Sequence, residues 1–447
     1  MIKTLSPDIV VIGAGPVGCV IALAFAHRGA KVMLLEAQPH KMKQLAGEWI
    51  HPPGLQILKS FGIDLSFNSV NYPTGIGFVV FPDDGNQPIQ LSYPSSVRGL
   101  SCEHNFIVST LRKAVDDCQD INFVSPARVT QIQGQQLTVD HLKQGETLTL
   151  FAEHIVGADG RSSVARKALG IPHHPELISC MAGVLLKEVE LPFEGFGHVF
   201  LGGPGPALAY RIGHNQVRMC LDVPFGFQKK TAHLWDVYRS ILPSELLGVF
   251  RQALEQEQVV WVANQYSSRI HYGRSGLSLV GDATGYFHPM TATGMTVGFM
   301  DVECLVQSQT FEEYQNQRSL GTYVPEMLAT TLHEVFCRSD ESAIAIRRAM
   351  YQMWRQDPKE CVRTMHLLSG AETNLLQFSR SLLKGLAIAL KYVIQENLSP
   401  KQWRHLMQVV GDLTGWLQLP LTIALSRFRQ PLSIRKGFVA QKVTFRL

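Results

Sequence analysis

Residues 8–37 read DIVVIGAGPVGCVIALAFAHRGAKVMLLEA, and this stretch decides the fold. The apolar run Ile9–Ile12 is typical of a buried strand in a parallel sheet. A glycine motif of the form G-x-G-x-x-G follows at Gly13, Gly15 and Gly18. The Ala-rich run after it predicts a helix that ends at Gly29, and the next apolar run predicts a second strand closed by Glu36. The stretch therefore predicts a β-α-β unit.

Each part of this unit suits a dinucleotide ligand. The first glycine allows a tight turn, the second lets a pyrophosphate approach the backbone, and the third lets helix and strand pack closely. Amides at the helix N-terminus can bind the phosphates. Glu36, 18 residues after Gly18, can accept hydrogen bonds from both hydroxyls of an unphosphorylated adenosine ribose. A lone G-x-G-x-x-G is a weak signal, but this context makes it strong. FAD and NAD both fit at this point.

The whole chain has 447 residues, enough for two or three domains. It is 45% hydrophobic and 17% charged, as in a soluble globular protein, and its net charge of +4 gives no indication of nucleic acid. The charge is uneven, because residues 377–447 hold eleven Lys or Arg against two Asp or Glu. This basic end predicts an acidic partner or contact with a membrane surface.

Cysteine usage and hydropathy indicate the compartment. The eight cysteines are scattered without any C-x-x-C, so we expect reduced thiols. The first strand begins by residue 9, which argues against a secretory signal. No run of 18 uninterrupted apolar residues occurs, so no membrane-spanning helix is expected. We therefore expect a cytoplasmic protein, with peripheral contact to the cytoplasmic face of a membrane as the alternative.

A second motif separates FAD from NAD. Residues 277–295 read LSLVGDATGYFHPMTATGM, a predicted strand that ends in Gly281-Asp282 and a loop that leads to a helix starting at Gly294-Met295. An acid at a strand end can bind the ribityl hydroxyls of a flavin. The helix start offers amides to the pyrophosphate and to the flavin O2. NAD has no such second requirement, so the motif favours FAD. Taken alone, it also fits an ordinary helix with a capping Asp.

A third motif, Val156-Gly-Ala-Asp159-Gly160-Arg-Ser-Ser163, completes the set. The three motifs in this order resemble the FAD-dependent aromatic hydroxylase and epoxidase superfamily, and within it the sequence most resembles the squalene monooxygenases. The segments that carry this second resemblance are Gly47–Pro52, Phe106-Ile107 with Leu111–Ala114, Pro206–Pro224, His288–Thr291 and Gly294–Val297.

The resemblance implies a Rossmann-like α/β FAD-binding domain with an inserted antiparallel β-sheet substrate domain and a helical C-terminal region. It also implies that NADPH or NADH reduces FAD, with Asp159-Gly160 supporting both nucleotides. Reduced flavin and O2 would form a C4a-hydroperoxide. Its distal oxygen would epoxidise or hydroxylate a hydrophobic polyene, terpenoid or polyketide in a water-free cavity. The expected domains are 1–75, 98–175 and 264–335 for FAD, 76–97 and 176–263 for the substrate sheet, and 336–447 for the helical region.

The candidate site residues follow from the motifs and the resemblance. The residues expected to bind FAD are Gly13, Gly15, Gly18, Glu36, Val129, Asp159, Gly160, Gly281, Asp282, Pro289, Gly294 and Met295. The candidates for the cavity wall are Phe78, Tyr210 and His288, although aromatics in a sheet are often plain core and His288 suits a loop hydrogen bond. No acid–base dyad is expected. No metal is expected either, because the pair His173-His174 has no third ligand nearby. Arg112 and Lys113 are expected on a solvated helix face.

Several residues depart from the family pattern. Gln44 and Asn105 fall where squalene monooxygenases place arginines near the FAD, and Ala37 follows the acid where the family often has Arg. In the same comparison His51 replaces a Gln and Phe78 a Tyr. These departures predict weaker binding of the pyrophosphate and argue against squalene itself as substrate.

Other functions stay open from the sequence. A flavin-dependent reductase of prenyl chains, of the geranylgeranyl reductase type, would form its product without O2. A catalytically silent, membrane-associated flavin-binding protein would fit the missing arginines. A halogenase is disfavoured, since the W-x-W-x-I-P signature is absent.

The apolar segments 382–394 and 413–425 are too short to span a bilayer. They could lie on its surface or form a helical lid over the substrate cavity. If the segments lie on the bilayer surface, four basic residues would lie near the lipid head groups: Lys384, Lys391, Arg427 and Arg429.

Overall fold

The computed structural model describes residues 4–39, 45–65, 74–143, 145–227, 231–256, 258–396 and 403–416. A six-stranded sheet forms the expected Rossmann-like part, in the strand order β19-β20-β13-β2-β3-β9. Its strands are β2 (Ile9–Ile12), β3 (Val32–Leu35), β9 (Ile121–Val124), β13 (His154–Gly157), β19 (Gly273–Arg274) and β20 (Leu277–Leu279). All neighbours from β20 to β9 pair in parallel. The predicted β-α-β unit is confirmed.

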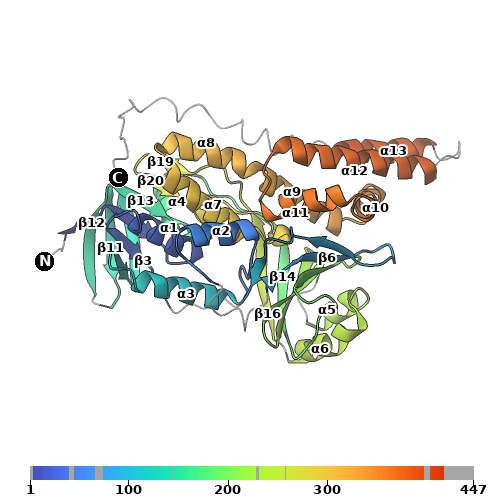
Figure 1. Ribbon diagram of the computed structural model, residues 1–447, viewed down its shortest axis with the longest axis horizontal. Helices are drawn as coiled ribbons and strands as arrows, with labels where there is room; N and C mark the ends of the chain where they lie inside the picture. The colour runs from blue at the N-terminus through green and yellow to red at the C-terminus, as the bar shows by residue number, and fades with distance from the viewer. Residues whose placement is uncertain are drawn as a thin grey trace.

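Helices α1 (Pro16–Ala26), α3 (His104–Asp116) and α7 (Gly294–Gln307) pack together beside this sheet (Figure 1). Helix α1 is buried from Gly18 to Ala26, because its neighbours cover it on all sides. This explains its Ala-rich composition, since small apolar residues let helix and sheet approach closely. Helix α2 (Pro52–Ser60) lies against α7 in the same core.

Two smaller sheets complete this part. One has the order β1-β12-β11-β10, with β1 (Thr4–Leu5), β10 (Ala127–Gln133), β11 (Gln136–His141) and β12 (Glu146–Phe151). The other joins β4 (Trp49–Ile50), β5 (Thr74–Gly75) and β8 (Gly99–Ser101). The short helix α4 (Val164–Ala168) follows β13 and packs on β10.

A seven-stranded sheet forms the predicted insertion. Its order is β18-β14-β17-β16-β15-β6-β7. The strands are β6 (Gly77–Phe81), β7 (Ile89–Ser92), β14 (Glu176–Lys187), β15 (Phe196–Phe200), β16 (Ala207–Gly213), β17 (Gln216–Pro224) and β18 (Val259–Tyr266). The alternating apolar residues within 71–93 and the turn residues Asp83–Asn86 predict a hairpin here, and β6 pairs with β7 to form it. The sheet departs from a purely antiparallel one at a single pair, β15 with β6, which is parallel. That pair joins the hairpin to strands more than a hundred residues later in the chain.

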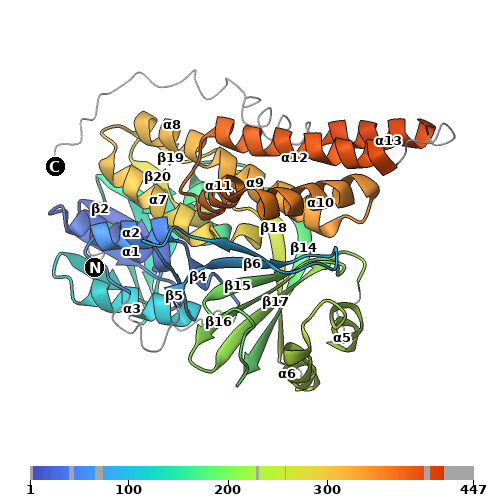
Figure 2. The same cartoon turned by 45° about the vertical axis from the view of Figure 1, so that its right-hand side comes forward.

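The two faces of this sheet pack against different helices (Figures 1 and 2). Met181 and Val199 point to a core shared with the C-terminal helices, whereas their neighbours Ala182 and Phe200 point to a core shared with α5 (Thr231–Tyr238) and α6 (Ser244–Glu255). The side chains alternate because successive residues of a strand face opposite sides. The sheet is therefore the middle layer of three.

Six helices follow α7 among the described residues, of which the first packs on α7 and the other five form the outer layer over the seven-stranded sheet. They are α8 (Phe311–Gly321), α9 (Tyr323–Cys337), α10 (Glu341–Gln356), α11 (Pro358–Ser369), α12 (Leu375–Glu396) and α13 (Trp403–Gly415). Helix α9 runs directly over the sheet, and α12 packs on α10 and α13 (Figure 2). In the part of the chain that the structure describes, no helix combines the length and hydropathy needed to cross a bilayer.

The sequence also predicts one helix over residues 234–257, a strand over 265–271 and Ser339 as the N-cap of the helix after it. The structure differs from these three local predictions. The helix expected over residues 234–257 is two helices, because Pro243 begins a new one. The strand expected over 265–271 ends at Tyr266. Asp340, and not Ser339, caps α10, since its side chain accepts the Ala343 amide. Gln44, Arg427, Arg429 and most of segment 413–425 lie outside the described residues, and the domain boundaries stay a prediction.

Candidate active site

Four motif turns meet at one edge of the six-stranded sheet. Gly13 follows β2, Glu36 follows β3, Asp159 lies just after β13, and Gly281 lies just after β20. These four strands are adjacent and parallel, so their carboxyl ends open on the same side. In open α/β sheets this edge is where ligands bind. The topology thus brings together turns as far apart in the sequence as Gly13 and Gly281.

The first glycine turn has the shape of a phosphate cradle. A Cβ at Gly13 (φ +98°) would lie 2.6 Å from the Ala158 carbonyl oxygen, and a Cβ at Gly18 would lie 1.8 Å from that of Gly13. Packing therefore requires both glycines. A Cβ at Gly15 would meet nothing within 4 Å, and neither would one at Gly160 or Gly294. This open space at the start of α1, lined by backbone amides, fits a pyrophosphate.

Glu36 is held beside the same turn. Its Oε2 accepts the Ala14 amide at 2.9 Å and its Oε1 accepts the Gln38 amide at 2.7 Å. Arg112 from α3 donates through Nε to the Ala14 carbonyl at 3.0 Å and lies 3.3 Å from Glu36 Oε2. The prediction of a solvated face was therefore wrong for Arg112. The sequence held no signal that separates Arg112 from the exposed Lys113 beside it.

The second glycine turn lies against the first motif. A Cβ at Gly281 (φ +62°) would come within 3.2 Å of Val17 Cγ2 on α1. The next residue, Asp282, is half-exposed, and its Oδ2 lies 3.3 Å from Arg161 Nε. The Arg161 guanidinium in turn stacks 4.7 Å above the Tyr286 ring. The two predicted turns are thus neighbours, with the Asp282 carboxylate accessible beside them.

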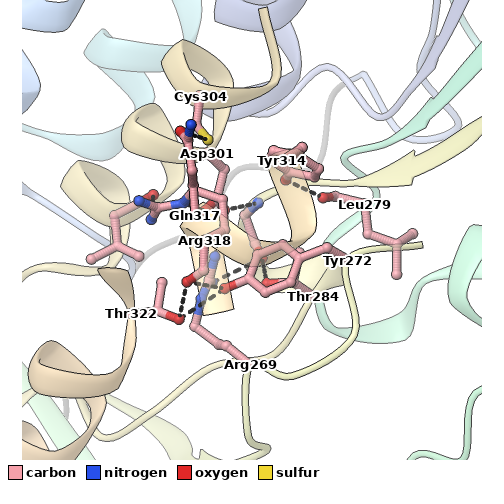
Figure 3. Close-up of polar contacts among 12 residues, drawn as sticks. Arg269, Tyr272, Leu279, Thr284, Asp301, Cys304, Tyr314, Gln317, Arg318 and Thr322 are labelled. Carbon is pink, nitrogen blue, oxygen red and sulfur yellow. Dashed lines mark hydrogen bonds and ion pairs between the residues drawn. The ribbon is translucent and has the colours of Figure 1, made fainter. Parts of the chain in front are cut away.

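A buried ion-pair network fixes this second turn (Figure 3). Asp301 on α7 is fully buried; its Oδ2 accepts the Gly281 amide at 2.8 Å and pairs with Arg269, while its Oδ1 accepts Arg318 Nε at 2.8 Å. Arg269 also donates to the Gly281 carbonyl at 3.0 Å. Sequence analysis missed these residues. The signal was an acid in the middle of a buried helix.

Two other FAD candidates have structural contacts of their own. Asp159 Oδ2 accepts the amides of Val164 and Ala165 at 2.6 and 3.2 Å, and it thereby satisfies two amides in the first turn of α4, whose N-cap is Ser163. Its Oδ1 is buried without a hydrogen-bond partner among the described residues, and burial raises the pKa of this carboxyl. The Val129 side chain is buried in the core between β10 and the parallel sheet. The roles of both in FAD binding stay predictions.

The loop before α7 is held by His51. Burial lowers the pKa of His51 to about 4, so the ring is neutral. A carbonyl can only accept, so His51 Nε2 donates to the Thr291 oxygen at 2.8 Å, and Nδ1 accepts from the Tyr93 hydroxyl at 2.6 Å. Ala292 next in the chain has a left-handed φ of +53°, which the loop must stabilise. Pro289 and Gly294 lie exposed on either side of it.

Phe78 and Tyr210 lie on the helix-facing side of the seven-stranded sheet. The Phe78 ring centroid is 5.0 Å from that of Trp49, and Met290 of the loop belongs to the same apolar core. The Tyr210 hydroxyl donates to Glu48 Oε2 at 3.1 Å, and Glu48 forms a buried ion pair with Arg218 at 2.8 Å. Burial raises the pKa of Glu48, although Arg218 favours its charged form.

His288 is placed differently from the other two cavity candidates. Its ring is buried, and its Nε2 lies 3.2 Å from Ser179 Oγ and 3.4 Å from Asp222 Oδ1. Asp222 is four residues after Arg218 on β17, so His288 sits further along the same face of the sheet. It belongs to a polar cluster under α9 and not to the aromatic group around Phe78.

Comparisons with known proteins agree with this geometry. The sequence model of squalene epoxidase matches residues 151–410, more than half of the chain. The chain belongs to the squalene epoxidase family. A model of pyridine nucleotide-disulphide oxidoreductases matches residues 2–71, which contain the first glycine motif. The family assignment makes the protein an FAD-dependent monooxygenase that uses NAD(P)H as reductant.

Related proteins align over most of the chain. A squalene epoxidase of Aspergillus fumigatus is 28% identical over 382 residues, covering 78% of this chain and 79% of that protein. One from Candida albicans is 26% identical, covering 81% and 87%. Among solved structures, p-nitrophenol 4-monooxygenase from Pseudomonas putida has a TM-score of 0.67 at 17% identity, covering 83% of this chain and 100% of that one. A flavin-dependent brominase has a TM-score of 0.68 at 17% identity, covering 86% and 98%. These structures share the fold.

Proposed function

We propose that this enzyme epoxidises or hydroxylates a hydrophobic polyene, terpenoid or polyketide. Per turnover, one O2 and one NAD(P)H with a proton would give one oxygenated product, one water and NAD(P)+. FAD supplies the redox chemistry when bound, because reduced flavin activates O2. The chain would bind the cofactor, orient the substrate and exclude water. The observation that carries the proposal is the convergence of both glycine turns beside an apolar core that joins the sheet to α9.

The proposed cofactor contacts involve backbone amides and two carboxylates at this edge of the sheet. The amides at Gly15 and at the start of α1 would hold the pyrophosphate, with Glu36 toward the adenosine ribose. Asp282 would bind the ribityl chain, and the amides around Gly294 and Met295 would face the flavin ring. The proposed FAD-binding domain unites residues 1–75, 98–175 and 264–335.

The substrate would lie between the seven-stranded sheet and the C-terminal helices. The core there contains apolar side chains from both layers, and Phe78 and Trp49 lie at its edge toward the loop 288–291. Phe78 stands where the family has Tyr, and His51 stands where it has Gln. Both substitutions alter the polar groups next to the loop. A substrate other than squalene fits these changes.

The reductant and the location are part of the proposal. We expect NADPH or NADH to approach near Asp159-Gly160, where the backbone is open at Gly160. Peripheral membrane contact through the basic C-terminal region would suit a lipophilic substrate. Lys384, one of the lysines expected near head groups, instead pairs with Asp357 at 2.6 Å and with Glu360 at 3.2 Å. The other basic residues of this region would carry that contact.

Product analysis with 18O2 tests the function. Flavin-loaded protein, NADPH or NADH and a panel of polyenes, squalene included, should give a product that contains one 18O atom and consumes one reductant. The variant D282A, which should be largely flavin-free, should give none. A saturated product formed without O2 would instead establish the prenyl reductase. Flavin-loaded protein that oxidises no NAD(P)H with any lipophilic compound would make the chain a silent binding protein.

A further inference from the structure

A cluster of potential metal ligands lies between β17 and α9. Asp222 on β17 is fully buried, and His333 and Cys337 are four residues apart on α9. Residues at this spacing share one face of a helix. One carboxylate oxygen, one imidazole nitrogen and one sulfur all lie within 4.8 Å of one another. No sequence motif indicates this set, because Asp222 is more than a hundred residues from the helix.

Two of the three distances between these atoms match those around a tetrahedral ion. His333 Nε2 lies 3.1 Å from Asp222 Oδ2, and Cys337 Sγ lies 3.5 Å from the same oxygen. Zinc bonds of ordinary length at tetrahedral angles place a nitrogen and an oxygen ligand about 3.3 Å apart, and an oxygen and a sulfur ligand about 3.5 Å apart. Two of the three pairs are therefore spaced like ligands of one ion, and the third pair, His333 Nε2 and Cys337 Sγ, lies within 4.8 Å.

The His333 nitrogen lacks the alignment of a hydrogen bond. His333 is 9% exposed, and its Nε2 has no hydrogen-bond partner among the described residues despite the nearby carboxylate. A buried nitrogen that faces a carboxylate oxygen without an aligned proton is unfavourable. A cation between the two atoms would satisfy both.

The surroundings of Asp222 support such an ion. Its Oδ1 accepts Ser179 Oγ and, at 3.1 Å, Asn264 Nδ2. These contacts orient the carboxylate and leave Oδ2 directed at His333 and Cys337. Outer contacts of this kind typically fix metal ligands. Cys337 is only half-buried, which gives an ion a way in.

Charge balance favours a divalent ion. Asp222 carries one negative charge, a thiolate at Cys337 would carry a second, and His333 as a ligand is neutral. A divalent cation makes the group electroneutral, which suits a buried position. On binding, the Cys337 proton leaves to solvent and the sulfur–metal bond forms without any change of oxidation state. The mixed N, O and S donor set is one that Zn²⁺ accepts.

We propose that Asp222, His333 and Cys337 form a binding site for a divalent transition-metal ion of the zinc type. The ion would fasten α9 to the seven-stranded sheet, with a water or His288 Nε2 in the fourth position. It is a structural site next to the loop 288–291, and it is independent of the proposed substrate. This proposed site differs from the sequence-based expectation of no metal, which considered only the pair His173-His174.

Cobalt(II) binding to the purified flavoprotein tests the site directly. After chelator treatment and dialysis, titration with Co²⁺ should give d–d bands above about 600 nm with the intensity of tetrahedral coordination, where flavin does not absorb. Zinc should remove them, and elemental analysis of zinc-loaded, dialysed protein should find about one ion per chain. No cobalt band together with no retained zinc would overturn the proposal.

Matched cysteine variants locate the ion. C337S and H333Q should each weaken zinc binding by at least about a hundredfold, since each removes a direct ligand. C361S, at another half-buried cysteine on α11, should bind zinc as the parent does. Flavin content and circular dichroism check the fold of each variant. Should C337S fail to fold, the cobalt spectrum of the parent decides alone. Zinc binding unchanged in both ligand variants would refute the site.

Discussion

Asp301 stabilises the second glycine turn, Gly281-Asp282, although it lies outside the sequence motif that contains this turn. Its carboxylate accepts the Gly281 amide and forms ion pairs with two buried arginines, Arg269 and Arg318. A buried charge is stable only when it is paired and hydrogen-bonded, and here each partner depends on the other. The position of Asp282, which we propose binds the ribityl chain, therefore depends on a residue about twenty positions later in the chain.

Replacing Asp301 by Asn should lower both stability and flavin content. The change leaves Arg269 and Arg318 without their counter-charge, which costs about 3–5 kcal/mol of unfolding free energy. Denaturant unfolding and the ratio of flavin to protein absorbance measure the two effects. E303Q, at an acid two residues away on the same helix, should change neither. Full flavin content in D301N would show that the turn holds its shape without the carboxylate.

Buried neutral histidines make the protein acid-sensitive. Burial lowers the pKa of His51, His154 and His198 to about 4 each, whereas an unfolded histidine titrates near 6.5. Between these values the unfolded chain binds protons that the native chain does not. Stability therefore rises with pH across this window and falls on acidification.

The unfolding free energy should decrease as the pH falls from about 6.5 to about 4, by up to about 3 kcal/mol for each such histidine. Denaturant titrations at pH 7 and pH 5 measure the difference. H51Q keeps a donor for the Thr291 carbonyl but cannot titrate, so it should show a smaller difference than the parent. An equal pH dependence in H51Q would mean that His51 is not neutral in the native state.

Polar residues of strand β17 lie in a row on the side of the sheet that faces the C-terminal helices. Arg218, Cys220 and Asp222 alternate with apolar residues that face α5 and α6. Arg218 pairs with Glu48 in front of β4, which fastens the edge of the FAD-binding part to the substrate sheet. The strand thereby joins layers that lie far apart in the sequence.

A double-mutant cycle measures this link. R218M should destabilise the protein by about 3–5 kcal/mol, because it leaves the buried Glu48 carboxylate unpaired. E48Q should cost a similar amount, and the double variant much less than the sum, since no uncompensated charge remains. Denaturant unfolding gives all four values. Strict additivity would show that Glu48 and Arg218 do not stabilise one another.

The three-layer arrangement leaves an apolar outer surface on the last helices. Leu376 and Leu383 on α12 are 78% and 55% exposed, and Met407 on α13 is 55% exposed. The opposite side of α12 packs into the core over the sheet. The helices therefore cover the substrate sheet, as expected of a lid, and also present large apolar side chains outward.

A triple variant, L376Q with L383Q and M407Q, should bind anionic vesicles at least about tenfold more weakly, because it removes three side chains that can enter a bilayer. Vesicle sedimentation measures the bound fraction. L142Q with L177Q changes side chains of similar exposure elsewhere, 47% and 45%, and should bind as the parent does. Equal binding of the triple variant would remove these helices from the proposed membrane contact.

The sequence by itself determined the nucleotide-binding unit. Each part of this unit has a local steric or hydrogen-bonding role that holds in any protein. These parts are the strand Ile9–Ile12, the glycines at 13, 15 and 18, and Glu36. The sequence also determined the second turn at Gly281-Asp282 and the β6–β7 hairpin. In the hairpin, the alternation of apolar and polar residues and the turn residues all lie within one short segment.

Only the tertiary structure decided which distant residues share a site. Arg112 at the first turn, Asp301 at the second, and Asp222 beside His333 are single polar residues in apolar elements. In the sequence they look like solvated or incidental positions, and helix ends such as those at Pro243 and Asp340 depend on local caps that composition does not resolve. A charge becomes costly only once the fold removes it from water, so its partner is chosen by packing between segments and not by spacing along the chain.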